Sequence, residues 1–145
     1  MKIYGMAGHL IRRLNQISTQ TFSKKVKAAG FDLTPVQFAA MEAIATHPGI
    51  DQAGVAARIA YDRATIGGVV DRLVQKGYVE RNVSRLDRRA REVRLTEQGE
   101  ALLQSVLPVV ADLQEDILGA LTPEERETFK ALAAKAVQLS PSTGM

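Results

Sequence analysis

Residues 62–95 read DRATIGGVVDRLVQKGYVERNVSRLDRRAREVRL, and a change of pattern within this stretch decides the fold. Asp62 is a good N-cap for a helix, and apolar residues at helical spacing follow it as far as Leu73. Gly77 suits the left-handed position at which many helices end. The first half of the stretch therefore predicts one helix, from Asp62 to about Lys76.

The second half changes to a period of two, which is typical of strands. Residues 78–83 and 91–95 alternate in this way, and the polar, charged residues 84–90 lie between them. We therefore expect an antiparallel ribbon of two strands, with a basic hairpin tip, directly after the helix.

Three helices are predicted before this stretch. Thr34, Pro35 and Gln37 form a capping-box start for one of them. Residues 5–29 and 51–60 also have helical apolar spacing. Two short helices joined by a tight turn and followed by a basic hairpin make a winged helix-turn-helix.

Two more helices are predicted after the ribbon, capped by Thr96 and Thr122. The apolar seam of the first is expected at Leu102, Val106, Val109, Leu113 and Ile117. Pro108 lies inside this helix, where proline costs roughly 3 kcal/mol, so we expect packing against a partner to hold the helix together. This seam and the apolar first helix exceed what one small core needs, which favours a dimer.

The fold class is therefore mainly α: a winged helix-turn-helix with a two-stranded β wing, flanked by N- and C-terminal helices. We expect one domain over residues 1–145, because its length suits a single core. The winged helix occupies about 34–95, and the flanking helices about 5–30 and 97–140.

The net charge is only +3, but residues 58–94 carry +5 and the rest of the chain −2. The basic residues of this segment are Arg58, Arg63, Arg72, Lys76, Arg81, Arg85, Arg88, Arg89, Arg91 and Arg94. A basic middle between more acidic ends is expected of a region that binds a polyanion. Charge alone equally allows a solvated surface.

The helix over 62–76 is the candidate recognition helix, because the second helix of such a pair enters the major groove with its N-terminal residues at the base edges. Arg63 suits bidentate pairing with guanine, and Thr65 suits a base edge or a thymine methyl group. Gly67 and Gly68 are unfavourable in a helix, which indicates close approach either to DNA or to another helix. At the wing tip, Arg85, Arg88 and Arg89 suit phosphates or a narrow minor groove.

The sequence resembles the MarR-type regulators. Residues 87–89 (DRR) followed by 93–99 (VRLTEQG) are similar to the wing signature of that family. Residues 33–37 (LTPVQ) and 71–79 (DRLVQKGYV) fit the same family in the same order. The resemblance covers about residues 8–139.

The resemblance implies a homodimer formed by the first and last two helices. It also implies a pseudo-palindromic operator, commonly bound as a repressor, with half-sites roughly 10 bp apart. It implies that Arg89 reaches the minor groove and that Asp87 pairs with an arginine to hold the wing. Many relatives carry a basic or polar side chain where this chain has Gly68, which leaves the operator sequence open. The residues expected at DNA are Arg63, Ala64, Thr65, Gly67, Gly68, Arg72, Arg85, Asp87, Arg88 and Arg89.

Many regulators of this type release DNA when a small molecule, often an aromatic carboxylate, binds between the dimerisation and DNA-binding regions. On the predicted first helix, steps of three and four residues give a polar stripe of His9, Arg13, Gln16 and Gln20. One hypothesis is that His9 and Arg13 receive an anionic effector, with Phe38 and Met41 as the apolar wall. The alternative, which we favour, is a solvated or interfacial stripe.

Several other functions are disfavoured. The chain has no cysteine, which excludes thiol chemistry, and no cluster at metal-ligand spacing or phosphate-binding loop, so we expect no enzyme, metal or cofactor. No signal peptide or membrane span is recognisable, so we expect a cytoplasmic protein without a membrane partner. A winged-helix module that docks to protein is the main alternative, but a wing tip with three arginines favours DNA.

Overall fold

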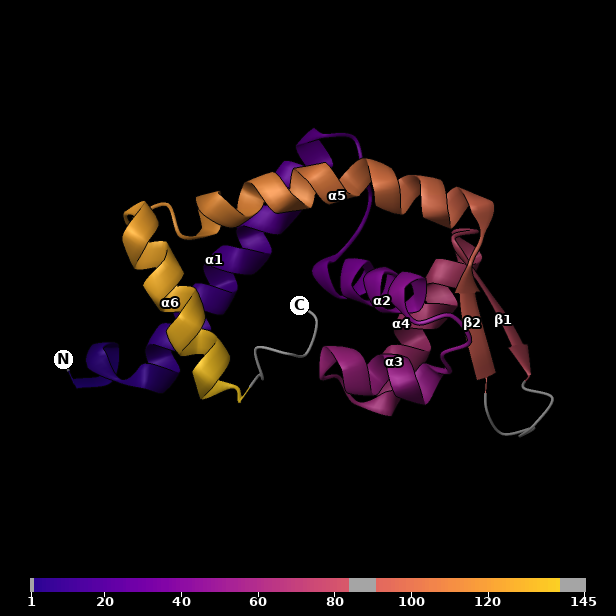
Figure 1. The fold of residues 1–145 in the computed structure, drawn as a ribbon, viewed down its shortest axis with the longest axis horizontal. Helices are drawn as coiled ribbons and strands as arrows, with labels where there is room; N and C mark the ends of the chain where they lie inside the picture. Colours follow the sequence, from indigo (N-terminus) through magenta and orange to yellow (C-terminus); the bar gives the residue numbers. More distant parts are fainter. Residues whose placement is uncertain (1, 84–90, 139–145) are drawn as a thin grey trace.

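The computed structural model describes residues 2–83 and 91–138, so the predicted wing tip lies outside the described part of the chain. The elements in chain order are η1 (Lys2–Gly5), α1 (Ala7–Ala28), α2 (Pro35–Thr46), α3 (Gln52–Ile59), α4 (Arg63–Gln75), β1 (Val79–Val83), β2 (Arg91–Leu95), α5 (Glu97–Ile117) and α6 (Pro123–Ala136). This order confirms the predicted winged-helix fold (Figure 1).

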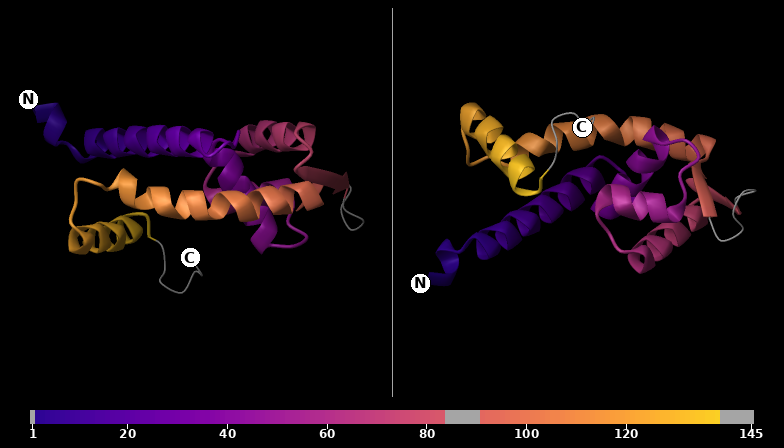
Figure 2. Two further views of the ribbon diagram at one scale, coloured as in Figure 1. Left: turned by 90° about the horizontal axis from the view of Figure 1, so that it is seen from above. Right: turned by 60° about the horizontal axis from the view of Figure 1, so that its bottom comes forward.

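The long helix α5 connects the two ends of the molecule. The winged part, α2 to α4 with the two strands, lies at one end of α5, and α6 lies at the other (Figure 1). Helix α1 contacts α5 and diverges from it towards the N-terminus, as the right view of Figure 2 shows, and α5 also contacts α2. None of the described helices combines the length and the apolar character that a membrane crossing needs.

Side-chain caps fix the helix starts, as the sequence predicted. The Thr34 side chain accepts a hydrogen bond from the Gln37 backbone N–H, and the Gln37 side chain accepts one from the Thr34 N–H, which completes a capping box. Thr122 and Glu125 form the same arrangement at the start of α6. Asp62 caps α4 through the Thr65 N–H. Because these caps are local, they are visible in the sequence alone.

A single apolar core joins the winged part to α1 and α5. Its largest fully buried side chains are Met41, Ile66, Leu73, Leu113, Val26, Val55, Val70, Val93 and Val106. Only the C-terminal part of α1 enters this core, through Phe22 and Val26. The N-terminal part of α1 leaves Leu10 and Ile11 exposed.

Helix α5 continues through Pro108 without interruption. Its buried side chains are Leu103, Val106, Val110 and Leu113, together with Gly99. The predicted seam was therefore correct at Val106 and Leu113 only, because Leu102, Val109 and Ile117 are half-buried at the flank of the true seam.

The two strands form the predicted antiparallel ribbon, in which Val79 pairs with Leu95 and Arg81 with Val93. A short segment before α3 extends the ribbon, because the Val93 N–H donates to the Ile50 carbonyl over 3.0 Å. Asp51 and Glu92 form an isolated bridge at the same edge. The base of the wing is thus bonded to the segment that leads into the helix-turn-helix, which the sequence did not predict.

Thr96 joins three elements at one point. Its hydroxyl donates to the Gly77 carbonyl over 2.6 Å and accepts from the Gly99 N–H over 3.0 Å. Its own N–H donates to the Tyr78 carbonyl over 3.0 Å. The end of α4, the start of the wing and the start of α5 therefore meet at this residue.

Candidate nucleic-acid interface

Helix α4 has one face in the core and one face open to solvent. Ile66, Val70 and Leu73 are buried on the inner face. Its exposed residues include Arg63, Ala64 and Thr65 in the first turn, Gly68 in the middle and Arg72 in the last turn. Residues three and four apart share a helix face, so Gly68 lies on the outer face between Ala64 and Arg72. The structure therefore brings together five of the residues predicted to contact DNA.

The N-terminus of α4 is held by Asp62. Its carboxylate accepts hydrogen bonds from the Thr65 backbone N–H over 2.7 Å and from the Thr65 hydroxyl over 2.9 Å. These bonds lower the pKa of Asp62 below its ordinary value of 3.8, because they stabilise the charged form. Thr65 therefore keeps its methyl group and oxygen lone pairs for a base edge, while its proton is already donated.

The turn between α3 and α4 is tight. Ala60 adopts the left-handed conformation, with φ 60° and ψ 44°, and the Tyr61 N–H donates to the Ala56 carbonyl over 3.0 Å. This conformation cannot continue a right-handed helix, so α3 ends at Ala60. It is uncommon for an L-residue other than asparagine or aspartate. The chain can then start α4 at Arg63, so α3 and α4 form the predicted helix-turn-helix.

Arg81 connects the wing to the recognition helix. Its Nη1 donates to Asp71 Oδ1 on α4 over 2.7 Å and to Gln52 Oε1 on α3 over 2.8 Å. Asp71 is the one acidic residue within α4. The ion pair compensates its negative charge, so the cations Arg63 and Arg72 dominate the exposed side of the helix.

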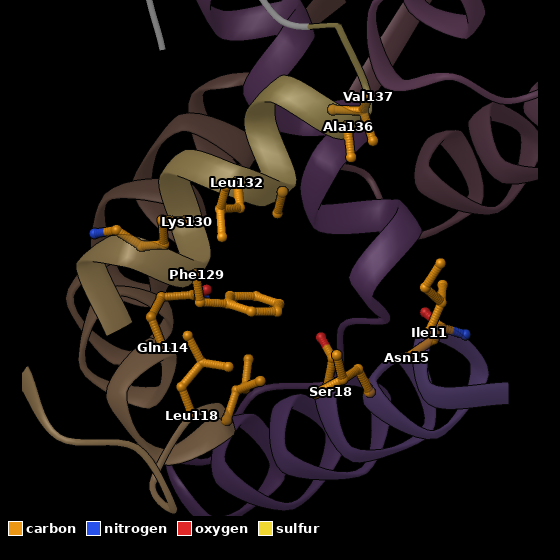
Figure 3. Close-up of a pocket in the computed structure, with 13 residues that line it drawn as sticks. Ile11, Asn15, Ser18, Gln114, Leu118, Phe129, Lys130, Leu132, Ala136 and Val137 are labelled. Atoms are coloured by element: carbon orange, nitrogen blue, oxygen red, sulfur yellow. The ribbon is translucent and has the colours of Figure 1, made fainter. Parts of the chain in front are cut away.

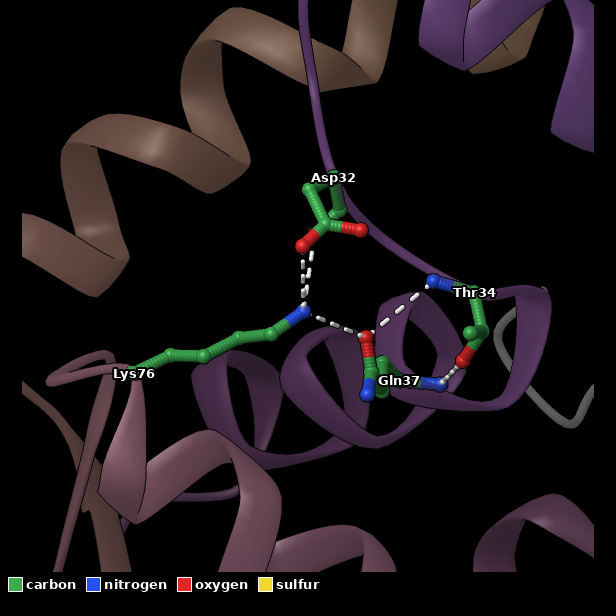
Figure 4. Close-up of polar contacts among 4 residues, drawn as sticks. All are labelled: Asp32, Thr34, Gln37 and Lys76. Atoms are coloured by element: carbon green, nitrogen blue, oxygen red, sulfur yellow. Dashed lines mark hydrogen bonds and ion pairs between the residues drawn. The ribbon is translucent and has the colours of Figure 1, made fainter.

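Lys76 connects the other end of α4 to the start of α2 (Figure 4). Its Nζ donates to the Asp32 carbonyl over 2.9 Å and to Gln37 Oε1 over 3.3 Å, and it lies 3.5 Å from the Asp32 carboxylate. Gln37 is the buried polar residue of the described chain, and its Oε1 also accepts from the Thr34 N–H. The linker from α1, the start of α2 and the end of α4 are therefore held by one cation.

Arg81 and Lys76 were not singled out as site residues from the sequence. Each reaches partners ten to 44 positions away, and no local pattern marks such contacts. The predicted wing-tip residues Arg85, Asp87, Arg88 and Arg89 lie outside the described residues, so their roles stay predictions.

Comparison with known proteins identifies the architecture. A family model described as the MarR family matches residues 31–90. The transcriptional regulator HosA of Escherichia coli O127:H6 is 34% identical over 135 residues, which are 93% of this chain and 97% of HosA. The chain belongs to the MarR family.

Solved structures of MarR-family proteins support the same assignment. BpsR of Bordetella bronchiseptica matches with a TM-score of 0.84 at 28% identity, over 94% of this chain and 96% of BpsR. The BpsR structure concerns the regulation of its DNA binding by 6-hydroxynicotinic acid. The transcriptional repressor CouR, bound to a 23-mer DNA duplex, matches with a TM-score of 0.83 at 26% identity, over 94% of this chain and 95% of CouR. The MarR family comprises transcriptional regulators and not enzymes, which agrees with the sequence analysis.

The predicted effector residues are not all brought together. Arg13 Nη1 donates to Gln16 Oε1 over 2.8 Å, so these members of the polar stripe share a face. Phe38 packs on Phe22, with 6.0 Å between ring centroids, and Phe22 follows His9 by 13 positions, or about 20 Å of helix. Met41 is 0% exposed within the core, and its part in a ligand site stays a prediction.

An apolar groove of about 660 Å³ lies between α1, α6 and the C-terminal end of α5. Figure 3 shows Phe129 on α6 pointing into it, facing Ser18 on α1, with Leu118, which directly follows α5, at its base. Helix α6, every residue of which the structure describes, has no buried side chain, and Leu132 is 61% exposed. This MarR-family protomer therefore carries an amphipathic helix whose apolar face is unpartnered.

Proposed function

We propose that this protein is a sequence-specific DNA-binding repressor that acts as a homodimer and releases DNA on binding a small anionic aromatic ligand. The observation that carries this proposal is the exposed face of α4, where Thr65, Gly68 and Arg72 lie opposite the buried side chains of Ile66, Val70 and Leu73, with Arg63 exposed at the start of the helix. A helix held this firmly on one side is suited to enter the major groove with the other.

Charge supports DNA as the partner. Both acids at α4 are compensated within the protein, Asp62 by the helix N-terminus and Asp71 by Arg81. Arg63 and Arg72 remain for guanine edges or phosphates. The solved complex of the relative CouR with a DNA duplex supports the same partner.

The unpartnered face of α6 supports a homodimer. Apolar side chains at the N-terminal part of α1 are exposed as well, with Ile11 at 66% and Leu10 at 49%. A second copy would cover these surfaces through an isologous interface, because the same groove exists on both chains. A two-fold dimer would place its two α4 helices on half-sites roughly 10 bp apart.

The ligand part of the proposal assigns His9 and Arg13 to an anionic group and Phe38 to an aromatic ring. His9 and Phe38 are too far apart in one protomer to hold a single small molecule, so this site requires the residues to meet across the dimer. The link between 6-hydroxynicotinic acid and DNA binding in the relative BpsR supports this ligand class.

A salt-titrated binding assay tests the proposal. The probe is the DNA upstream of the protein's own gene, and a scrambled duplex of the same composition is the control. Specific binding should exceed the control, and both affinities should fall steeply with salt through counterion release. Equal, weak binding to both duplexes would leave two explanations: a winged-helix module that docks to protein, or an operator elsewhere. Selection of binding sequences from random duplexes distinguishes them, because only a DNA-binding protein would enrich a sequence.

A further inference from the structure

Five glycines lie inside the α-helices that the structure describes, and packing explains two of them. A Cβ added to Gly99 would collide with the Tyr78 carbonyl, because the first turn of α5 packs on the start of the wing. A Cβ added to Gly54 would come within 2.7 Å of the Ile50 side chain. These two positions require glycine for reasons internal to the fold.

Gly67 and Gly68 in α4 have no such reason. A Cβ added to either would have no neighbouring atom within 4 Å in the described chain beyond its own helix backbone. Neither has the positive φ that would favour glycine, since the positive-φ glycines among the described residues are Gly30, Gly49 and Gly77. The alternative that they allow close packing against another helix of the same protomer is therefore excluded.

The two glycines nevertheless weaken the helix that they occupy. Among the residues of a helix interior, glycine is the least favourable after proline, because it loses the most backbone entropy on folding. A recognition helix that contains two of them in succession loses stability without gaining contacts inside the protomer. The described residues of the protomer supply no compensating contact, which points to a binding partner.

Their position indicates the partner. Gly68 is exposed at the centre of the outer face of α4, one turn from Arg72, and Gly67 is half-buried beside it. A helix without a Cβ at this point can bring its backbone closer to a neighbouring surface by about the thickness of a methyl group. On the major-groove edge of DNA, the group that needs such space is the C5-methyl of thymine.

We propose that Gly67 and Gly68 are specificity determinants, and that Gly68 accommodates a thymine methyl group in each half-site. This inference rests on the proposed function of α4 as a DNA-recognition helix. The bare backbone leaves room for a thymine methyl group at one position, while Arg63 and Arg72 supply polar contacts on either side. A side chain at position 68 would exclude the methyl group and push α4 away from the bases.

The experiment begins by selecting binding sequences for the full-length protein from a pool of random 25 bp duplexes. Affinities for the selected duplex are then compared between the wild-type protein and Gly68→Ala, on DNA with dT and on DNA with dU at the selected thymines. We expect Gly68→Ala to bind the dT duplex about tenfold more weakly and to recover most of this loss on the dU duplex, which lacks the methyl groups.

Two matched variants control for helix stability. Gly68→Ala, Gly67→Ala and Gly8→Ala each replace a helix glycine with open surroundings, and Gly8 lies on α1, far along the chain from α4. Gly68→Ala and Gly67→Ala should each raise Tm by roughly 2–4 °C. Gly67→Ala should lose less affinity than Gly68→Ala, and Gly8→Ala should lose none.

The outcomes are distinguishable. If the wild-type protein selects no sequence, the proposed function itself fails. If it selects a sequence and Gly68→Ala binds it as tightly as the wild type, or loses equally on dT and dU DNA, the proposed function stands and the methyl-accommodation inference is overturned.

Discussion

Arg81 on the first wing strand donates to Asp71 on the recognition helix, with 2.7 Å between Nη1 and Oδ1. The Arg81 side chain is 26% exposed and that of Asp71 is 55% exposed, so the pair is partly shielded from solvent. This contact does two things at once. It sets the direction in which the wing leaves α4, and it compensates an acid beside the proposed DNA-facing surface.

Arg81→Gln should therefore weaken DNA binding roughly fivefold, equivalent to about 1 kcal/mol, because Asp71 would then repel phosphate. The double variant Arg81→Gln with Asp71→Asn should regain most of this affinity, since the uncompensated charge is gone. Fluorescence anisotropy with a labelled operator at two salt concentrations measures both. If the single variant binds like the wild type, Asp71 does not face DNA.

Removing the shared amide of Gln37 should destabilise the fold. Gln37→Ala deletes one half of a capping box and takes from Lys76 the Oε1 that it contacts over 3.3 Å. We expect a loss of about 1–2 kcal/mol in urea unfolding. Glu125→Ala removes the equivalent group from the capping box of α6, where Glu125 is exposed, and should cost less. Equal losses would show that the contact with Lys76 adds nothing to the cap.

Acid should weaken the start of α4 through Asp62. Its folded-state pKa is lowered, so its stabilising effect is present above the ordinary value of 3.8 and is lost as the pH falls below 3.8 through the folded-state value. Asp62→Asn keeps a capping oxygen without the charge, so the stability difference between it and the wild type should shrink as the pH falls below 3.8, where the carboxylate protonates. Unfolding midpoints across that range measure the difference. A constant difference would mean that the Asp62 charge does not stabilise the folded state.

A charge in the apolar groove should disrupt self-association. Leu132→Glu places a carboxylate on the exposed apolar face of α6, and we expect it to weaken the dimer at least about tenfold. Ala131→Glu introduces the same group on the opposite face of α6 and should sediment like the wild type. Sedimentation equilibrium measures both. An unchanged dimer in Leu132→Glu would move the interface away from α6.

The ligand hypothesis has its own test at Arg13. The probes are 6-hydroxynicotinic acid and benzoate. Arg13→Ala should require a higher ligand concentration than the wild-type protein for release from the operator. Gln20→Ala, on the same helix, is the control. An unchanged response in Arg13→Ala, with the dimer intact, would remove this residue from the ligand site.

Much of the fold follows from local chemistry. The caps at Thr34, Asp62 and Thr122 lie within three residues of the groups they bind, so the sequence alone reveals where these helices begin. The change from helical to strand spacing after Gly77 likewise locates the wing. These features need no knowledge of the tertiary structure.

The remaining features depend on distant contacts. The buried seam of α5 contains Leu103 and Val110 where spacing alone predicted Leu102 and Val109, because α1 and α2 determine which face is covered. Met41 has the same apolar character as a pocket wall, and only the packed structure shows that the core encloses it. The partners of Arg81 and Lys76 are likewise brought close only by folding.

The junction at Thr96 has a mechanical consequence. Because Thr96 is hydrogen-bonded to the end of α4, to the start of the wing and to the start of α5, a rotation of α5 about this junction would carry α4 and the wing with it. A tilt of about 5° along a helix about 30 Å long displaces its far end by roughly 2.5 Å, most of the rise between successive base pairs. A displacement of similar size at the α6 end would therefore rotate α4 and the wing together. In the proposed dimer this rotation would alter the distance between the two α4 helices.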